Sequence, residues 1–200
     1  IKEIVFCSTG SIYGESKKIP TPENDRFPLQ TSMYGASKLA CEGLIQAYAE
    51  AYHIKSHIFR FVSILGQRYT HGHIIDFYKK LKKNSKELKI LGNGNQKKSY
   101  LHVNDCIDAI LHLVRKNIKN KVNIYNLGTN ETITVKESAK IICKHLKLKP
   151  KLIYSGGKRG WIGDVPLIKL SINKIKNTGW RPKNSIKKSI IDTLNYLQDN

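Results

Sequence analysis

A tyrosine and a lysine stand four residues apart in the segment YGASK, as Tyr34 and Lys38. Residues 31–52 have helical apolar spacing, and Thr31 or Ser32 is available as the N-cap. Positions i and i+4 share one face of a helix. The positive end of the helix and the lysine ammonium would both favour a phenolate over a phenol. A phenol tuned in this way can act as a general acid and base.

Two hydroxyl side chains, Ser8 and Thr9, end the apolar run EIVFCS, which we predict to be a buried parallel strand. α/β sheets bind ligands at the carboxyl ends of their parallel strands. A hydroxyl at that edge can hydrogen-bond a substrate oxygen beside Tyr34. The YxxxK spacing alone also occurs in many proteins where the tyrosine is structural, and it is the nearby hydroxyl pair that favours chemistry.

Strands and helices alternate along the chain, which is typical of βαβ units and a parallel sheet. We expect the helix at 31–52 to pack through a face of small and apolar residues, Leu39, Gly43, Leu44, Ala47 and Ala51. The predicted strands are 3–8, 55–65, 99–103, 122–128 and 151–156, and the other predicted helices are 77–89, 103–116, 134–146, 171–180 and 185–198. Thr134 and Glu137 have the spacing of a capping box.

The composition is that of a globular protein, with 200 residues of which 40% are hydrophobic. The sequence has neither an apolar run long enough to span a bilayer nor a signal-peptide pattern. Its four cysteines lie far apart in apolar segments, which indicates buried thiols in a reducing, cytoplasmic compartment. His71 and His73 have no carboxylate or third ligand nearby, so we predict loop histidines and no metal site.

The net charge of +20 raises the alternative of a nucleic-acid-binding protein. However, the lysine-rich segment 77–89 reads as the solvated face of an amphipathic helix, without interleaved aromatic residues or a recognition motif. We therefore expect neither a nucleic-acid nor a membrane partner. The basic excess would help to attract an anionic small molecule.

Five segments in order, FCSTGSIYGE, YGASK, FRFVSILGQR, ILGNGNQKKSYLHVNDCIDAIL and RGWIGDVPLIKLSINKIKNTGWRP, resemble the extended short-chain dehydrogenases that modify nucleotide sugars. The resemblance is to the UDP-glucose 4-epimerase type. It implies an α/β fold, NAD as cofactor, a nucleotide-sugar substrate and a homodimer. By this resemblance, residues 1–67 and 98–127 form the C-terminal part of the NAD-binding Rossmann sheet, and residues 68–97 and 128–200 form a smaller α/β substrate domain.

The resemblance also implies roles for single residues. Tyr34 would be the base that takes the proton from the sugar 4-hydroxyl while C4 is oxidised by NAD. Lys38 would activate the tyrosine and bind the nicotinamide ribose, and Thr9 would hydrogen-bond the same sugar oxygen. Ser8 would support the cofactor or the turn, and Phe61 would lie on the cofactor side.

The residues after Thr9 bear on the reaction. Related 4,6-dehydratases carry Asp-Glu there as an added acid and base, and related decarboxylases keep a Glu. This chain has Gly10 and Ser11 instead. The resemblance therefore favours C4 epimerisation over dehydration, with another nucleotide-sugar oxidoreductase or a non-catalytic nucleotide-binding relative as alternatives.

On the substrate side, Ser63 replaces an Asn that holds the diphosphate in relatives, which puts that contact in doubt. Ile75, with Ile74 and Phe77, would lie along the nucleotide, and plain core packing is an equal alternative. The remaining expected substrate contacts are Lys98, Tyr100, Arg159 and Asp164. The last two lie five residues apart, where relatives have a spacing of three.

The Gly-rich strand–turn–helix that wraps the NAD pyrophosphate in relatives does not occur in these residues. The chain also begins at Ile1, directly before a strand pattern. We therefore expect a fragment resembling the C-terminal two-thirds of an epimerase, which by itself binds NAD weakly. Tight NAD binding by the isolated piece in isothermal titration would contradict this expectation.

Overall fold

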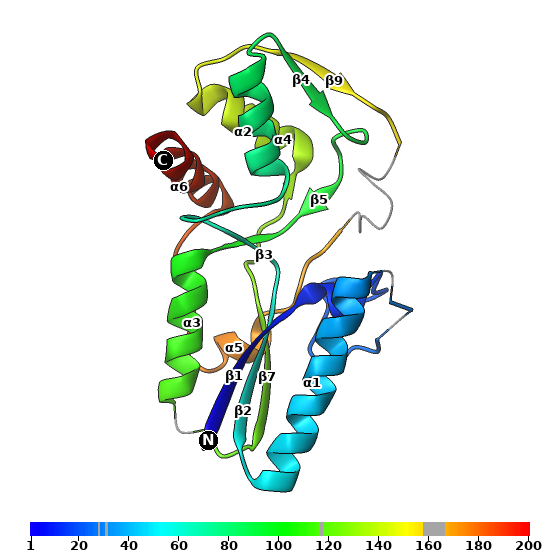
Figure 1. Ribbon diagram of the computed structural model, residues 1–200, viewed down its shortest axis with the longest axis vertical. Coiled ribbons are helices and arrows are strands. Elements are labelled where there is room, and N and C mark those ends of the chain that lie inside the picture. Colours follow the sequence, from blue (N-terminus) through cyan, green and yellow to red (C-terminus); the bar gives the residue numbers. More distant parts are fainter. Residues whose placement is uncertain (28, 31, 117, 158–166) are drawn as a thin grey trace. The chain divides into compact units, whose positions relative to one another are not determined.

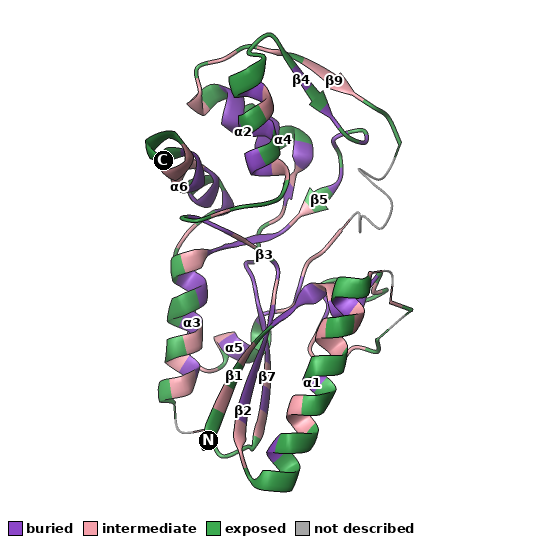
Figure 2. Cartoon of the chain, viewed as in Figure 1, coloured by how far each residue is buried: buried purple, intermediate pink, exposed green. Residues whose placement is uncertain are grey.

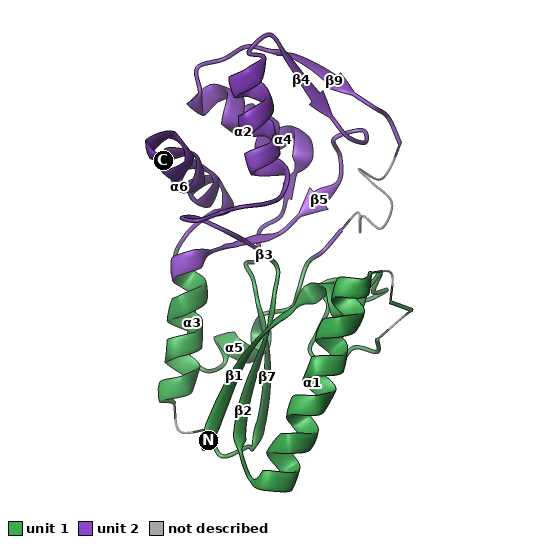
Figure 3. Cartoon of the chain, viewed as in Figure 1, with its two compact units in different colours: residues 1–62, 105–130, 169–183 green, residues 63–104, 131–168, 184–200 purple. Residues whose placement is uncertain are grey.

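The computed structural model describes residues 1–27, 29–30, 32–116, 118–157 and 167–200 (Figure 1). Strands and helices alternate along the chain, and the predicted α/β fold is confirmed. The chain divides into two compact units (Figure 3). Unit 1 is Ile1–Val62, Asp105–Asn130 and Lys169–Lys183; unit 2 is Ser63–Asn104, Glu131–Ile168 and Asn184–Asn200.

This division differs from the one expected from the sequence. Residues 63–67 and 98–104 belong to unit 2, and residues 128–130 and 169–183 belong to unit 1. Each unit is assembled from three separate chain segments, so its boundaries depend on contacts between residues distant in sequence.

Unit 1 is built on a three-stranded parallel sheet in the order β1-β2-β7. The middle strand is buried along most of its length, as expected of a parallel strand covered on both faces. Figure 1 shows α1 on one side of the strands and α3 and α5 on the other. The elements of unit 1 are β1 (Glu3–Thr9), a short 3-10 helix η1 (Gly10–Tyr13), α1 (Met33–Tyr52), β2 (Lys55–Phe61), β7 (Val122–Leu127) and α5 (Asn173–Lys176), with α3 (Val103–Arg115) beginning at the boundary with unit 2.

Helix α1 begins where the sequence predicts, because the Ser32 hydroxyl accepts a hydrogen bond from the Gly35 amide at 3.0 Å. The other predicted cap, Thr31, lies outside the described residues. The predicted packed face was wrong: Gly43, Leu44, Ala47 and Ala51 are exposed. The buried positions are Gly35, Glu42 and Ala49, spaced seven apart, which form a narrow stripe facing the sheet (Figure 2). The apolar spacing misled because the helix buries a carboxylate in place of a leucine.

Unit 2 has a core formed by three helices and three short strand pairs. The core consists of buried apolar side chains of α2 (His73–Lys83), α4 (Val135–His145) and α6 (Ile186–Asp199), together with those of adjoining strands. The parallel pairs are β3 (Ser63–Leu65) with β6 (Tyr100–His102) and β4 (Glu87–Ile90) with β9 (Lys151–Tyr154); the antiparallel pair is β5 (Lys97–Lys98) with β8 (Ile133–Thr134).

Two predicted helices are shorter in the structure. The helix expected at 77–89 is α2, which ends at Lys83, and residues 87–90 form β4 with alternating burial. Leu88 and Ile90 therefore share one face at the period of a strand, not of a helix. The helix expected at 171–180 is the single turn α5, which has no side-chain cap.

All four cysteines are free. Cys106 and Cys143 are buried as predicted, but Cys7 and Cys41 are exposed. Within the described ranges, no helix combines the length and apolar character needed to cross a membrane. The same residues contain no cluster of three or more potential metal-ligating side chains.

Candidate active site

Lys38 links α1 to the end of β1. Its ammonium donates a hydrogen bond to the Cys7 carbonyl oxygen at 2.9 Å. The same nitrogen lies 4.8 Å from the centre of the Phe6 ring and 6.0 Å from the centre of the Tyr34 ring. Lys38 therefore lies beside Tyr34. Its hydrogen-bond partner, Cys7, is two residues before Thr9 along β1.

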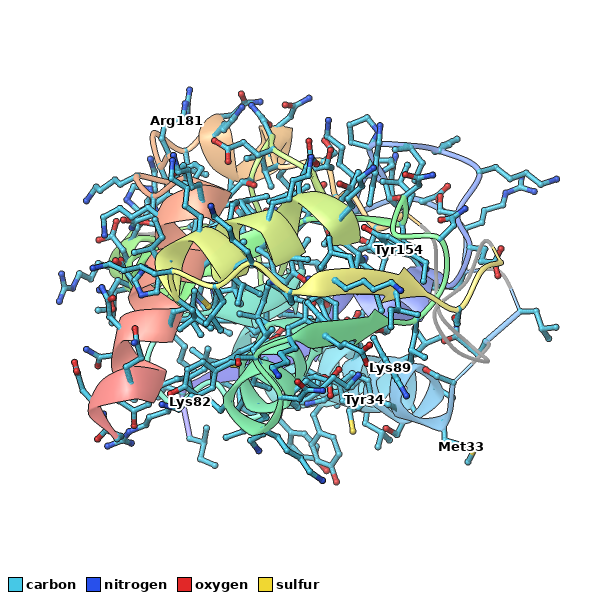
Figure 4. The ribbon with its side chains drawn as sticks, turned by 90° about the horizontal axis from the view of Figure 1, so that it is seen from above. Met33, Tyr34, Lys82, Lys89, Tyr154 and Arg181 are labelled. Carbon is cyan, nitrogen blue, oxygen red and sulfur yellow. The ribbon has the colours of Figure 1, made fainter. Side chains whose placement is uncertain are left out.

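Tyr34 lies in the first turn of α1 with its side chain 55% exposed. Figure 4 shows Met33 and Tyr34 projecting from this end of the helix. The next residue, Gly35, is buried, and a Cβ built on it would lie 3.0 Å from the Ser11 carbonyl oxygen. Only glycine permits this close approach of α1 to the segment after β1. The approach sets Tyr34 next to the turn that carries Thr9.

Thr9 is the last residue of β1 and the N-cap of η1. Its hydroxyl oxygen accepts a hydrogen bond from the Ser11 amide at 3.1 Å and its proton can be donated to the Ser11 hydroxyl at 3.2 Å. Across the sheet its register partner is Phe61, which is partly exposed. Thr9, Tyr34, Lys38 and Phe61 thus gather at the carboxyl edge of the parallel sheet, where such sheets bind ligands.

Ser8 points toward α1. Its side chain is buried, and its hydroxyl donates to the Glu42 carboxylate of α1. Ser8 therefore supports the turn and the packing of β1 against α1.

Sequence reasoning did not assign a role to the charged pair behind this edge, Glu42 and Arg60. Both are buried, and Arg60 Nη2 donates to Glu42 Oε2 at 2.7 Å while Nε donates to the same carboxylate at 3.1 and 3.2 Å. Burial alone would lower the pKa of Arg60, but the hydrogen bonds and charge interactions with Glu42 and Tyr13 together outweigh this effect and raise the pKa. The available signal was an arginine within the apolar strand HIFRFV, since arginine is almost never fully buried unless paired.

Three of the expected substrate contacts, Ser63, Lys98 and Tyr100, lie on strands of unit 2. Ser63 is exposed at the start of β3 and is the register partner of Tyr100 in β6. Tyr100 is buried, and its hydroxyl lies 3.0 Å from Nδ1 of His73, the first residue of α2 and not a loop residue as predicted. Lys98 is half-buried in β5.

Core packing accounts for two of the three predicted nucleotide neighbours. Ile74 and Phe77 are buried in the hydrophobic core of unit 2, and Ile75 is 8% exposed beside them on α2. Arg159 and Asp164 lie outside the described residues.

A parallel α/β sheet with a tyrosine–lysine helix beside a strand-end hydroxyl is the arrangement expected from the resemblance to short-chain dehydrogenases. Residues 1–128 match the sequence profile of the NAD dependent epimerase/dehydratase family. The chain belongs to this family.

Proteins with more than one activity are similar to this chain. The chain is 34% identical over 206 residues to a putative UDP-glucose 4-epimerase of Methanocaldococcus jannaschii, and this alignment covers all of the chain and 64% of the relative. It is 27% identical over 205 residues to the human dTDP-D-glucose 4,6-dehydratase, of which it covers 57%. The chain thus spans less than two thirds of the length of these relatives.

Solved structures of epimerases share the fold. A UDP-galactose 4-epimerase superposes with a TM-score of 0.90 at 30% identity, over all of this chain and 64% of that one. The Thermotoga maritima UDP-glucose 4-epimerase with bound UDP-glucose gives a TM-score of 0.87 at 28% identity, with the same coverage.

The carboxyl edge of unit 1 suits the NAD on which the family depends. It offers an ammonium donor on Lys38 for ribose hydroxyls, the exposed phenol of Tyr34, and the end of β2 at Phe61. These three residues are the ones that would hold the nicotinamide end of the cofactor.

Proposed function

We propose that the protein, in its complete natural form, catalyses NAD-dependent epimerisation at C4 of a nucleotide sugar of the UDP-glucose and UDP-galactose type. The observation that carries this proposal is the packing of the helix with Tyr34 and Lys38 against the strand that ends at Thr9. The Lys38–Cys7 hydrogen bond and the contact of Gly35 with Ser11 hold the two elements together.

Each of the three side chains has a chemical role in this proposal. Tyr34 takes the proton from the 4-hydroxyl and later returns it, as a general base and then acid. The Lys38 ammonium stabilises the phenolate charge during that transfer. Thr9 hydrogen-bonds the reacting oxygen. NAD, when bound, supplies the acceptor for the hydrogen and electron pair that leave C4 and then return to its other face.

In this proposal, the other residues that bind the nucleotide sugar come from the chain segments assigned to unit 2. Ser63 and Lys98 offer a hydroxyl and an ammonium for the diphosphate, with a contribution from Arg159 through its bidentate fork. Asp164 would accept hydrogen bonds from ribose hydroxyls. Tyr100 and Ile75 would contribute apolar surface at the nucleotide.

A dehydratase function, known for one relative, lacks support at the site. An acid–base pair would be needed directly after Thr9, where the chain has Gly10 and Ser11. A Cβ at position 10 would lie 3.1 Å from the Phe61 carbonyl oxygen and 3.2 Å from Leu170 Cδ1. The backbone therefore leaves little room for an aspartate at this position.

The test is conversion of UDP-galactose into UDP-glucose by the complete protein without added cofactor, followed by chromatography of the nucleotide sugars. We expect interconversion by the natural enzyme and a loss of roughly 10²–10⁴-fold in Tyr34→Phe, the usual contribution of a general acid–base group. Tyr196→Phe is the control, because it removes a tyrosine hydroxyl on α6, which belongs neither to the proposed catalytic residues nor to the proposed dimer surface.

The outcomes separate the alternatives. Near-full activity in Tyr34→Phe would show that the base is another residue. Release of water with formation of a 4-keto-6-deoxy sugar would indicate a dehydratase. Binding of UDP-sugars without turnover would indicate a non-catalytic relative.

We also propose that α1 contributes to a homodimer. Its outward side carries Leu44, Tyr48 and Tyr52, which are 62%, 58% and 67% exposed, and the two tyrosine rings stack with centres 5.5 Å apart. A second copy of this helix would cover that apolar surface. Leu44→Asp should then reduce the molecular mass measured by light scattering to that of a monomer; an unchanged mass would contradict the proposal.

A further inference from the structure

Both ends of the segment 8–13, which contains the last two residues of β1 and all of η1, are attached to the same buried ion pair. At one end, Ser8 donates to the Glu42 carboxylate. At the other end, the Tyr13 hydroxyl accepts a hydrogen bond from Arg60 Nη1 at 2.6 Å and donates to Asn126 Oδ1 at 2.9 Å. The candidate hydroxyl of Thr9 lies between these two attachments.

The ion pair also joins the three elements that form the site. Ser8 of β1 and Arg60 of β2 are register partners in the parallel sheet. Glu42 lies two helical turns after Tyr34 on α1, on the stripe that faces the sheet, and its exposed fraction is 0%. The carboxylate therefore receives hydrogen bonds from both strands while it belongs to the helix that carries the tyrosine and lysine.

We propose that Glu42 and Arg60 are positioning residues, which fix the separation between the Thr9 hydroxyl and the Tyr34 phenol. This inference rests on the proposed function. A buried ion pair is a poor source of stability, because removing two charges from water offsets most of their attraction. The ion pair can instead hold the reacting groups at a set separation, which matters because a displacement of about 1 Å at a reacting group can cost on the order of 10²-fold in rate.

The sharpest test is Ser8→Ala, which disconnects the strand from Glu42 but leaves both charges paired. We expect a loss in kcat of roughly 10- to 100-fold with little change in KM for the nucleotide sugar, because the reacting groups and not the binding groups are displaced. Glu42→Gln, which keeps the shape of the side chain and removes its charge, should lower kcat at least as much.

The matched control is Ser138→Ala. Ser138 is also fully buried, and its hydroxyl donates to the Thr134 carbonyl oxygen at 3.1 Å in α4. This variant loses a comparable hydrogen bond within unit 2 and should keep kcat. An equal loss of kcat in Ser138→Ala would show that general destabilisation, and not positioning, explains the effect.

A second measurement is independent of turnover. Hydrogen exchange in Ser8→Ala should accelerate at least about tenfold at the amides of Ser11 and Gly14, which donate to Thr9 Oγ1 and the Ser11 carbonyl oxygen, while the amides of β7 stay protected. Unchanged exchange in this segment would overturn the proposal even if the natural protein does not epimerise UDP-sugars. A loss of NAD affinity in proportion to kcat would also overturn it, because Ser8 would then be a cofactor contact.

Discussion

The ammonium of Lys38 donates to the backbone carbonyl oxygen of Cys7 at 2.9 Å, across the packing of α1 on β1. A lysine usually loses considerable side-chain entropy when it is held in one place. Here its hydrogen bond to Cys7 places its charge 4.8 Å from the centre of the Phe6 ring and 6.0 Å from the centre of the Tyr34 ring. The cation is thus preorganised beside the phenol that we propose to be the base.

The first prediction concerns this cation. Lys38→Met keeps much of the apolar stem but removes the charge and the hydrogen bond to Cys7. If Tyr34 is the base, kcat for UDP-galactose should fall roughly 10²-fold or more, because the phenolate loses its nearest positive charge. Steady-state kinetics of the complete protein provide the measurement.

Lys82→Met is the matched control for this prediction. Lys82 Nζ lies 6.0 Å from the Tyr78 ring centre, the same separation as between Lys38 Nζ and the Tyr34 ring centre. Lys82 is exposed on α2 and visible at the edge of the molecule in Figure 4. Equal rate losses in the two variants would show that any loss of a lysine slows the protein, and would contradict the role of Lys38.

The second prediction concerns Tyr13. Tyr13→Phe removes a buried hydroxyl that accepts from Arg60 Nη1 and donates to Asn126 Oδ1, so Asn126 Oδ1 loses this donor while Arg60 Nη1 keeps its hydrogen bond to the Glu23 carbonyl oxygen. The free energy of unfolding should fall by about 1–3 kcal/mol at pH 8. Urea denaturation measures the change, and Tyr196→Phe, which removes a tyrosine hydroxyl on α6, should be within about 0.5 kcal/mol of the natural chain.

The pH dependence of this effect has a defined sign. Burial raises the pKa of Tyr13 from 10.0 to about 12, with Arg60 opposing the shift. A raised pKa means that the folded state favours the protonated phenol. The stabilisation of the folded state by the protonated Tyr13 hydroxyl is therefore fully present below pH 10 and is lost as the pH rises toward 12. The stability difference between the natural chain and Tyr13→Phe should therefore narrow over that interval. A difference that stays constant from pH 8 to 12 would contradict the burial of the hydroxyl.

The features that depend on neighbouring residues were predictable from the sequence. Ser32 caps α1 and Thr134 forms a capping box with Glu137, because both motifs act within one helical turn. The catalytic roles of Thr9, Tyr34 and Lys38 stay predictions from their spacing and a family resemblance; all three residues belong to unit 1.

The features that depend on distant residues were not predictable. No local pattern shows that Glu42, and not Leu44, faces the sheet, because this choice depends on Arg60 of the next strand. The split of residues 77–89 into α2 and β4 depends on the pairing of β4 with β9, which is more than sixty residues away. Cys7 is exposed for a similar reason: its surroundings are set by tertiary packing and not by its apolar run.

The third prediction concerns thiol reactivity. Cys41 is exposed, whereas Cys106 is 7% exposed and burial raises the pKa of its thiol from 9.0 to about 12. At pH 8 the reactive thiolate fraction of Cys106 should be roughly 10³-fold below that of an ordinary thiol. A chain that keeps only Cys106 should react with a chromogenic disulfide only after denaturant is added, whereas free cysteine reacts rapidly with the same reagent at pH 8. Rapid labelling of native Cys106 would contradict its burial.

The last prediction concerns the capping box at the start of α4. Thr134 Oγ1 accepts from the Glu137 amide at 3.1 Å, and the Glu137 carboxylate accepts from the Thr134 amide at 2.8 Å. Thr134→Ala should lower the free energy of unfolding by about 1 kcal/mol. These hydrogen bonds to Thr134 hold the pKa of Glu137 below its ordinary 4.5. A lowered pKa gives stabilisation that is present at neutral pH and disappears as the pH falls through the folded-state value.

Urea denaturation at pH 7 and at pH 3 therefore separates this cap from a simple loss of packing. The deficit of Thr134→Ala relative to the natural chain should be larger at pH 7, because the substitution removes the Thr134 hydroxyl that donates to the Glu137 carboxylate at 2.7 Å, and this hydrogen bond is stronger when the carboxylate is ionised. Thr70→Ala, at an exposed loop threonine, should show no comparable deficit at either pH. An equal deficit for Thr134→Ala at both pH values would mean that Glu137 does not take part in the cap, and that the threonine acts alone at the first turn of α4.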